Sequence, residues 1–119
     1  MKWGVIFHAA FDVEFSAFAP AVQTALLAKA LMLEAFGPQL ARPHVDTLKG
    51  SKHANMKELR FEAAGGVWRA AFAFDTRRRA VILVAADKSG ASQTRFYRTL
   101  IAAADRRFDS HLAEAGKGD

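Results

Sequence analysis

The first third of the chain is mostly apolar, and its pattern predicts one strand and two helices. Residues 2–7 form a short apolar run that predicts a strand, and residues 10–18 predict a short helix that ends before Pro20. Residues 20–37 are rich in alanine and leucine, begin with proline and end at glycine, which predicts a second helix. Because this helix is apolar nearly all round, we expect it to be buried on more than one side, against the sheet alone or partly against a partner chain.

A polar connection separates this helical part from the next apolar segments. Residues 38–55 contain two prolines and a glycine, and a loop of this length in a compact domain is often functional. We therefore expect the connection to contribute to a binding site, and its cationic or titratable side chains are Arg42, His44, Lys49, Lys52 and His53.

Apolar residues then alternate with a period of two, which predicts strands at residues 58–62 and 67–75. A nearly continuous apolar run at residues 80–88 predicts a central strand. Residues 63–66 and 76–79 read as the hairpin turns between these strands. In the middle strand one face is apolar and is expected to face the core, with Trp68, Ala70, Phe72 and Phe74.

The other face of that strand combines a cation with two small side chains, Arg69, Ala71 and Ala73. Such a face leaves room above the alanines, and we expect it to be open to a ligand. Arg69 can instead form a cross-strand pair with Glu58 or Glu62.

The last periodic segment, residues 92–112, predicts an amphipathic helix. Its apolar face comprises Phe96, Leu100, Ile101, Ala104, Phe108 and Leu112. Residues 114–119 are expected to form a disordered tail. With 119 residues, no repeat and no linker, the chain is expected to form a single domain over residues 1–119.

The positive charge of the chain is concentrated in one region. The net charge is +5, but residues 42–107 hold fourteen basic and six acidic side chains, whereas the flanking regions are slightly acidic. A one-sided positive field attracts polyanions such as nucleic acid. The alternative is a basic surface that serves only solubility.

The composition indicates the cellular compartment in which the protein is expected. The chain has no cysteine, which excludes disulfides and thiolate metal sites and is consistent with a reducing compartment. No apolar run approaches the roughly 18 residues of a membrane span, and the first residues acquire acidic side chains too early for a signal peptide. We expect a cytoplasmic protein that does not contact membranes.

Motifs for several enzyme classes are missing. The four histidines lack metal-ligand spacing, and there is no glycine-rich phosphate loop and no G-x-S-x-G motif. Carboxylates are too scattered to suggest a glycosidase pair. We therefore expect no metal and no cofactor.

What remains is a set of cations and one phenol, namely Arg69, Lys88, Arg95 and Tyr97. Such a set can bind a phosphodiester and stabilise the charge that develops on it. RNA carries its own nucleophile, the 2′-hydroxyl, so no protein nucleophile is required. Tyr97, the single tyrosine, can alternatively be a helix residue that packs its ring at the edge of the core.

Five segments follow one another along the second part of the chain: "TLKG" (47–50), "KELRF" (57–61), "GVWRAAFAFD" (66–75), "RRAVILVAADK" (78–88) and "RFYRTLIAAADRRF" (95–108). Taken in this order, they resemble toxins of the RelE/ParE superfamily, and most closely the phage-derived, HigB-like branch. The resemblance covers residues 40–112 by motif and 1–39 by element order. It implies an α+β, RelE-like fold: an N-terminal strand and two helices, then a three-stranded antiparallel hairpin sheet that completes a twisted sheet, and a C-terminal amphipathic helix.

The resemblance also implies a function. Type II toxins of this kind pair with a small helix-turn-helix antitoxin, here a HigA-like one, and a heterotetramer of toxin and antitoxin is expected. RelE- and HigB-like members cleave mRNA on the ribosome without metal, by attack of the 2′-oxygen on the adjacent phosphate. Two alternatives are a ParE-like toxin that inhibits gyrase and a phage-derived remnant that only binds an antitoxin or RNA.

The resemblance assigns roles to individual residues. Arg69 falls on the sheet arginine that grips the scissile phosphate, and Lys88 on the basic residue that ends the last strand. Tyr97 falls near the tyrosine that some members use as general base, with His53 as the alternative base. Lys88 or Arg95 would offset charge on the leaving 5′-oxygen.

A second group of residues is expected to bind RNA. Lys57 and Arg60 fall around a basic pair on the preceding strand, and Glu58 occupies a place where a RelE-type member carries lysine. The expected RNA-binding residues are Lys49, Lys52, His53, Lys57 and Arg60.

Overall fold

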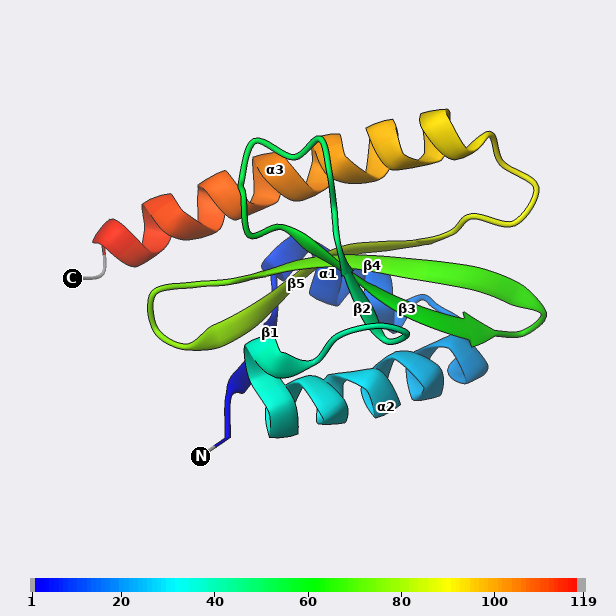
Figure 1. Cartoon of the computed structure of the whole chain (residues 1–119), viewed down its shortest axis with the longest axis horizontal. Helices are drawn as coiled ribbons and strands as arrows, with labels where there is room; N and C mark the ends of the chain where they lie inside the picture. The colour runs from blue at the N-terminus through cyan, green and yellow to red at the C-terminus, as the bar shows by residue number, and fades with distance from the viewer. Residues whose placement is uncertain (1, 118–119) are drawn as a thin grey trace.

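A mixed five-stranded sheet runs through the middle of the molecule and carries helices on both faces (Figure 1). The structure is a computed structural model that describes residues 2–117. The strands are β1 (Gly4–Phe7), β2 (Val45–Thr47), β3 (Lys57–Ala63), β4 (Gly66–Phe74) and β5 (Arg79–Asp87). Their order is β1-β5-β4-β3-β2, in which β1 is parallel to β5 and every other pair is antiparallel.

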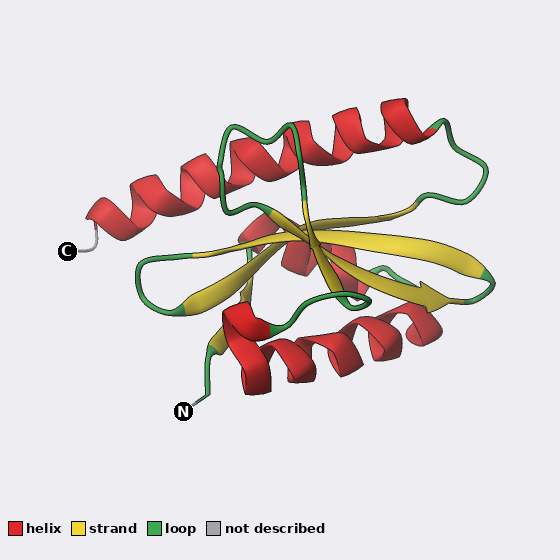
Figure 2. Cartoon of the chain, viewed as in Figure 1, coloured by secondary structure: helices red, strands yellow, loops and turns green. Residues whose placement is uncertain are grey.

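The helices divide between the two faces of the sheet (Figure 2). α1 (Ala9–Ser16) and α2 (Pro20–Phe36), which runs into a short 3₁₀ turn (Gly37–Gln39), cover one face, and α3 (Gln93–Lys117) lies across the other. Each face has its own apolar core. The first includes Phe11, Leu26, Leu33, Leu59, Phe72 and Ile82, and the second includes Met56, Ala71, Val81, Leu83, Leu100 and Ala104.

The predicted fold class and element order are confirmed, with two differences in detail. Strand β2 lies inside the connection expected to be a loop, and pairs with β3 at one edge of the sheet. It has only three residues, too few for a periodic pattern. α3 continues to Lys117, so residues 114–117 are helical and the prediction of a tail there was wrong; residues 118–119 lie outside the described part. No helix within residues 2–117 is long and apolar enough to cross a bilayer.

The prediction of an open sheet face was also wrong. The alternation in β4 is as expected, but α3 covers the face that carries Ala71 and Ala73, and both alanines are fully buried. Arg69 on the same face is only 6% exposed. Small side chains on this face leave space for the apolar face of α3, whose Phe96 and Phe108 pack into it.

A β-bulge and one arginine connect α1, β5 and α3. Ala71 pairs with Val84 and Phe72 pairs with Ile82, so Leu83 is the extra residue of the bulge. The Leu83 carbonyl accepts a hydrogen bond of 2.7 Å from Arg107 Nη1. Arg107 also donates to both carboxylate oxygens of Glu14, at 2.8 and 2.6 Å. A single guanidinium therefore satisfies the bulge carbonyl and fixes α3 to α1.

Glycine is required where α2 ends. Gly37 has a φ of +56°, and a Cβ at this position would overlap the Trp3 indole. Gly65, in the turn between β3 and β4, also has a positive φ of +77°, but a Cβ there would meet no atom within 4 Å. The two positions share the backbone constraint and differ in the space around them.

We expect Gly37→Ala to destabilise the protein more than Gly65→Ala. A positive φ costs a non-glycine residue about 1 kcal/mol at either position, and the overlap with Trp3 adds about 1–3 kcal/mol at Gly37 alone. The gain from a less flexible unfolded chain is the same for both variants and cancels in the comparison. Urea unfolding measures the difference, and equal midpoints would show that the Trp3 contact does not constrain this corner.

The Arg107–Glu14 pair should couple stability to pH. Hydrogen bonds from Arg107 are the main cause that lowers the pKa of Glu14. This stabilisation is fully present above the ordinary glutamate value of 4.5 and is lost as the pH falls through the lowered value. A double-mutant cycle with Glu14→Gln and Arg107→Gln should give about 0.5–1 kcal/mol of coupling at neutral pH, and less in acid.

The exposed Lys2–Glu34 pair, at 3.4 Å, provides the control for that cycle. Its lysine is 79% exposed, and we expect no measurable coupling at either pH. A coupling between Glu14 and Arg107 that stayed constant from neutral to acid pH would contradict an ionic origin.

Candidate functional site

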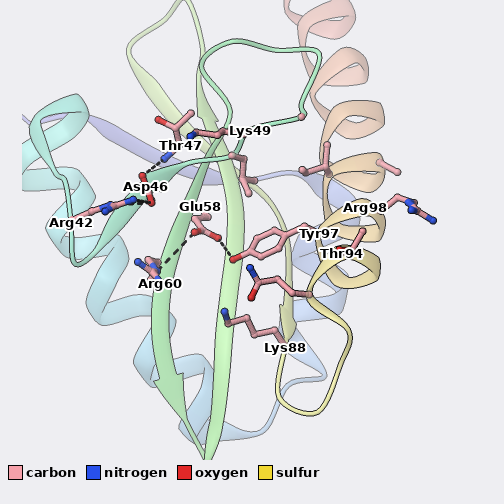
Figure 3. Close-up of a pocket in the computed structure, with 15 residues that line it drawn as sticks. Arg42, Asp46, Thr47, Lys49, Glu58, Arg60, Lys88, Thr94, Tyr97 and Arg98 are labelled. Carbon is pink, nitrogen blue, oxygen red and sulfur yellow. Dashed lines mark hydrogen bonds and ion pairs between the residues drawn. The ribbon is translucent and has the colours of Figure 1, made fainter.

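A cleft of about 1060 Å³ lies between the first turns of α3 and the β2–β3 edge of the sheet (Figure 3). Short β2 and the segment after it form one wall, and Gln93, Thr94 and Tyr97 of α3 form the other. The lining includes five cations and two carboxylates: Arg42, Lys49, Arg60, Lys88, Arg98, Asp46 and Glu58. Its chemistry therefore suits an anionic ligand.

Two side chains meet across this cleft (Figure 3). Tyr97 of α3 donates its hydroxyl proton to Oε1 of Glu58 on β3, at 2.7 Å. Burial is the main cause that raises the pKa of Tyr97, and the hydrogen bond to Glu58 acts in the same direction, whereas Arg69 opposes it. Tyr97 is therefore a neutral phenol at physiological pH.

Arg69 lies behind this pair and does not line the cleft. Its Nε is 3.6 Å from Oε1 of Glu58, and its Nη1 donates to the Trp68 carbonyl at 2.9 Å. The Nε is buried without a hydrogen-bond partner among the described residues. Of the two roles left open by the sequence, the observed one is the pairing with Glu58, in which Arg69 is a buried counter-charge.

Glu58 also faces a second arginine. Arg60 and Arg69 are directly opposite each other on β3 and β4, an arrangement in which like charges repel. The Nε of Arg60 is 3.9 Å from Oε2 of Glu58, whereas Arg69 approaches Oε1. One carboxylate thus lies close to both arginines and reduces the repulsion between them, which gives a physical reason for glutamate at this position.

Lys88 reaches the cleft from the end of β5. Its Nζ is 5.9 Å from the centre of the Tyr97 ring, within the range of a cation–π contact. The Lys88 backbone N–H donates to the Val67 carbonyl at 2.8 Å, while Asp87 accepts hydrogen bonds from the backbone N–H groups of Val67 and Ser89. These hydrogen bonds fix the position of the backbone at Lys88.

The structure brings together Lys49, Arg60, Lys88 and Tyr97 of the predicted site residues. The other five do not line the cleft. Lys57 shares the face of β3 that carries Leu59 and Phe61, so it points away from the cleft. Arg95 is exposed on the first turn of α3 and is not among the cleft residues.

Lys52 and His53 are held by α3. Lys52 forms an ion pair with Asp109, and His53 forms a hydrogen bond with the same carboxylate and packs edge-on against the Phe108 ring. Ser51 donates to Asp105 on the same helix, so the whole segment is fixed there. The Nε2 of His53 lies 2.8 Å from the Asp109 carboxylate and is engaged in that contact. Neither Lys52 nor His53 lines the cleft.

Two parts of the site were not predicted. Strand alternation places Glu58 on the face of Arg60, but the sequence offered it only as a possible partner of Arg69 and as a departure from the RelE pattern. Arg42 and Asp46 line the cleft and form a pair at 2.7 Å, and this hydrogen bond is the main cause that lowers the pKa of Asp46. Arg42 was expected in the binding connection, but its pairing with Asp46 was not, because β2 was not predicted.

The histidines have separate partners. His8 caps α1, His44 contacts Lys29 at 2.8 Å, His53 contacts Asp109, and His111 contacts Asp75 at 2.9 Å. Within residues 2–117, no three potential ligands among histidines and carboxylates lie close enough to hold a metal ion.

The chain is similar to known proteins in sequence and in fold. The profile of the family described as phage derived protein Gp49-like (DUF891) matches residues 13–109. Two proteins of Mycobacterium tuberculosis that are named as toxins are similar in sequence. HigB2 is 48% identical over 84 residues, which span 70% of this chain and 41% of HigB2. HigB3 is 44% identical over 87 residues, which span 73% of this chain and 74% of HigB3.

The fold is similar to that of a mutant of the Escherichia coli toxin RelE in the free state. The TM-score is 0.59 over 86% of this chain and 96% of that one, at 11% sequence identity. The fold is therefore RelE-like. The chain belongs to the phage-derived Gp49-like family and is similar in sequence to proteins named as HigB toxins, as its sequence motifs predicted.

Proposed function

We propose that the protein is the toxin of a type II toxin–antitoxin module and that it cleaves mRNA bound to the ribosome. The observation that carries this proposal is the cleft, in which cations surround the Glu58–Tyr97 pair. A polyanionic substrate and a proton transfer are the two requirements that such a site meets. The similarity to HigB2 and HigB3 supports the toxin assignment.

The cations would hold the RNA backbone. Lys49, Arg60 and Lys88 line the cleft from three different segments, and each can contact a phosphate. Phosphate contacts fix the register of a strand without reading its bases. Codon preference, if present, would then come from the ribosome or from other parts of the cleft.

The proposed reaction needs no group beyond the RNA and the side chains of this chain. The 2′-oxygen attacks the adjacent phosphorus, the bond from phosphorus to the 5′-oxygen breaks, and a 2′,3′-cyclic phosphate and a 5′-hydroxyl are formed. Lys88 would stabilise the charge on the phosphorane or on the leaving oxygen. Arg69, predicted to grip the phosphate, would act through Glu58, because it lies behind that carboxylate.

The partners follow from the same proposal. The antitoxin would be a small helix-turn-helix protein of the HigA kind, bound in a heterotetramer, and the site of action would be the cytoplasm, where translating ribosomes are. A gyrase inhibitor of the ParE kind would not require a carboxylate hydrogen-bonded to a phenol inside a cationic cleft. We therefore favour the ribonuclease.

We expect Lys88→Gln to weaken binding to ribosomes that carry a non-cleavable mRNA with a 2′-deoxy group at the target position. Removing one phosphate contact should reduce the slope of log affinity against log salt by about 0.7. The measurement is affinity across a salt series.

Lys57→Gln is the matched control. It removes the same charge from the opposite face of the sheet, close in sequence to Glu58. Its salt slope should equal that of the wild type. An equal loss from both variants would show that the basic field acts at long range and that the cleft does not hold the strand.

We also expect the purified protein to cleave mRNA only when translating ribosomes are present. The upstream fragment should end in a 2′,3′-cyclic phosphate, and a single 2′-deoxy substitution at the cleavage position should block the reaction. Primer extension and end-group analysis measure both. Intact mRNA together with inhibited gyrase supercoiling would support the ParE-like alternative.

A further inference from the structure

We infer that Glu58 is the proton acceptor of the proposed cleavage and that the Tyr97 hydroxyl passes the proton to it. This inference rests on the proposed ribonuclease function and replaces the sequence-based assignment of Tyr97 as a base acting alone. It concerns Glu58, at a position where the resemblance to RelE-type members implied lysine.

The hydrogen-bond direction excludes an unassisted tyrosine base. The Tyr97 hydroxyl has one proton, and that proton is donated to Glu58 at 2.7 Å. To act alone, Tyr97 would have to lose it first, which burial and the neighbouring carboxylate disfavour. As a neutral phenol, however, its oxygen still has lone pairs that can accept a proton from a substrate hydroxyl in the cleft.

The surroundings of Glu58 suit a charged resting state. It is only 6% exposed, a position in which an isolated carboxylate would be costly. Arg69 lies 3.6 Å from Oε1 and Arg60 lies 3.9 Å from Oε2, so the negative charge of the carboxylate is compensated. The charged or titratable groups that face it from the packed elements are Arg42 before β2, Asp46 of β2, Arg60 of β3, Arg69 of β4, Lys88 after β5, and Tyr97 of α3.

The proton balance of the step is complete. As the bond from the 2′-oxygen to phosphorus forms, the 2′-proton moves to the Tyr97 oxygen and the Tyr97 proton moves to Oε1 of Glu58. The bond from phosphorus to the 5′-oxygen breaks, and that oxygen takes a proton from Lys88 or from water. Tyr97 is neutral before and after, and Glu58 ends protonated, to be restored by solvent.

The test is the pH dependence of single-turnover mRNA cleavage on ribosomes at saturating protein. For the wild type we expect the rate to rise with pH and then level off, because protonated Glu58 cannot accept. Glu58→Gln should slow cleavage by about 100-fold or more, and the rising limb should disappear. Tyr97→Phe should also be slow but should keep the limb, since the carboxylate remains.

Two variants distinguish proton transfer from a structural role. Glu58→Asp keeps a carboxylate on a shorter side chain. It should restore part of the cleavage rate and the rise of that rate with pH, even though the carboxylate then lies farther from Arg69. Glu62→Gln removes an exposed carboxylate from the same face of β3 and should behave as the wild type. Urea unfolding of each variant separates loss of fold from loss of chemistry.

The outcomes are decisive in each direction. A Glu58→Gln protein that keeps the rising limb, or cleaves as fast as Glu62→Gln, overturns the inference and leaves the ribonuclease function in place. If Glu58→Gln does not fold, a Tyr97→Phe protein with the wild-type rate overturns it. If the wild type cleaves no mRNA on ribosomes, the proposed function itself fails, and the inference fails with it.

Discussion

The packing of α3 onto the sheet is the interaction on which the rest of the structure depends. The helix buries Phe96 and Phe108 against a face of β4 and β5 on which alanines let it approach closely. That contact creates the second core, covers Arg69 and carries Tyr97 to within hydrogen-bond distance of Glu58. Without it the sheet would have one buried face and one open basic face, and the cleft would lose a wall.

Polar contacts fix α3 at several points along its length. Asp105 and Asp109 hold the segment after β2, and Arg107 binds both Glu14 and the carbonyl of the bulge residue Leu83. Apolar packing alone is non-directional, whereas these hydrogen bonds set the register of the helix on the sheet. Register matters here because a shift of one helical residue, about 1.5 Å, would separate Tyr97 from its acceptor.

The RelE-like fold supplies the scaffold, and the chemistry belongs to the side chains placed on it. At 11% identity, the E. coli RelE structure shares the arrangement of elements with this chain. The site of this chain is built around Glu58, which lies close to two opposed arginines and binds the single tyrosine. Glu58 thus places a negative charge at the centre of a cationic cleft. Its presence also decides the role of Arg69, which is a partner of the carboxylate.

The sequence by itself determined the order of the elements and the cationic character of the region that forms the cleft. These depend on local periodicity, on turn residues and on composition, which can be read without knowing which parts meet. The fold class came from the resemblance of five sequence segments to the RelE/ParE toxins. Only the tertiary structure decided that Arg69 is buried, that Lys57 faces away and that Glu58 meets Tyr97, 39 residues apart. The physical reason is that strand alternation assigns a residue to a face but does not say what covers that face. β2 escaped prediction for a related reason, because three residues form a strand only when the edge of β3 is present to pair with them.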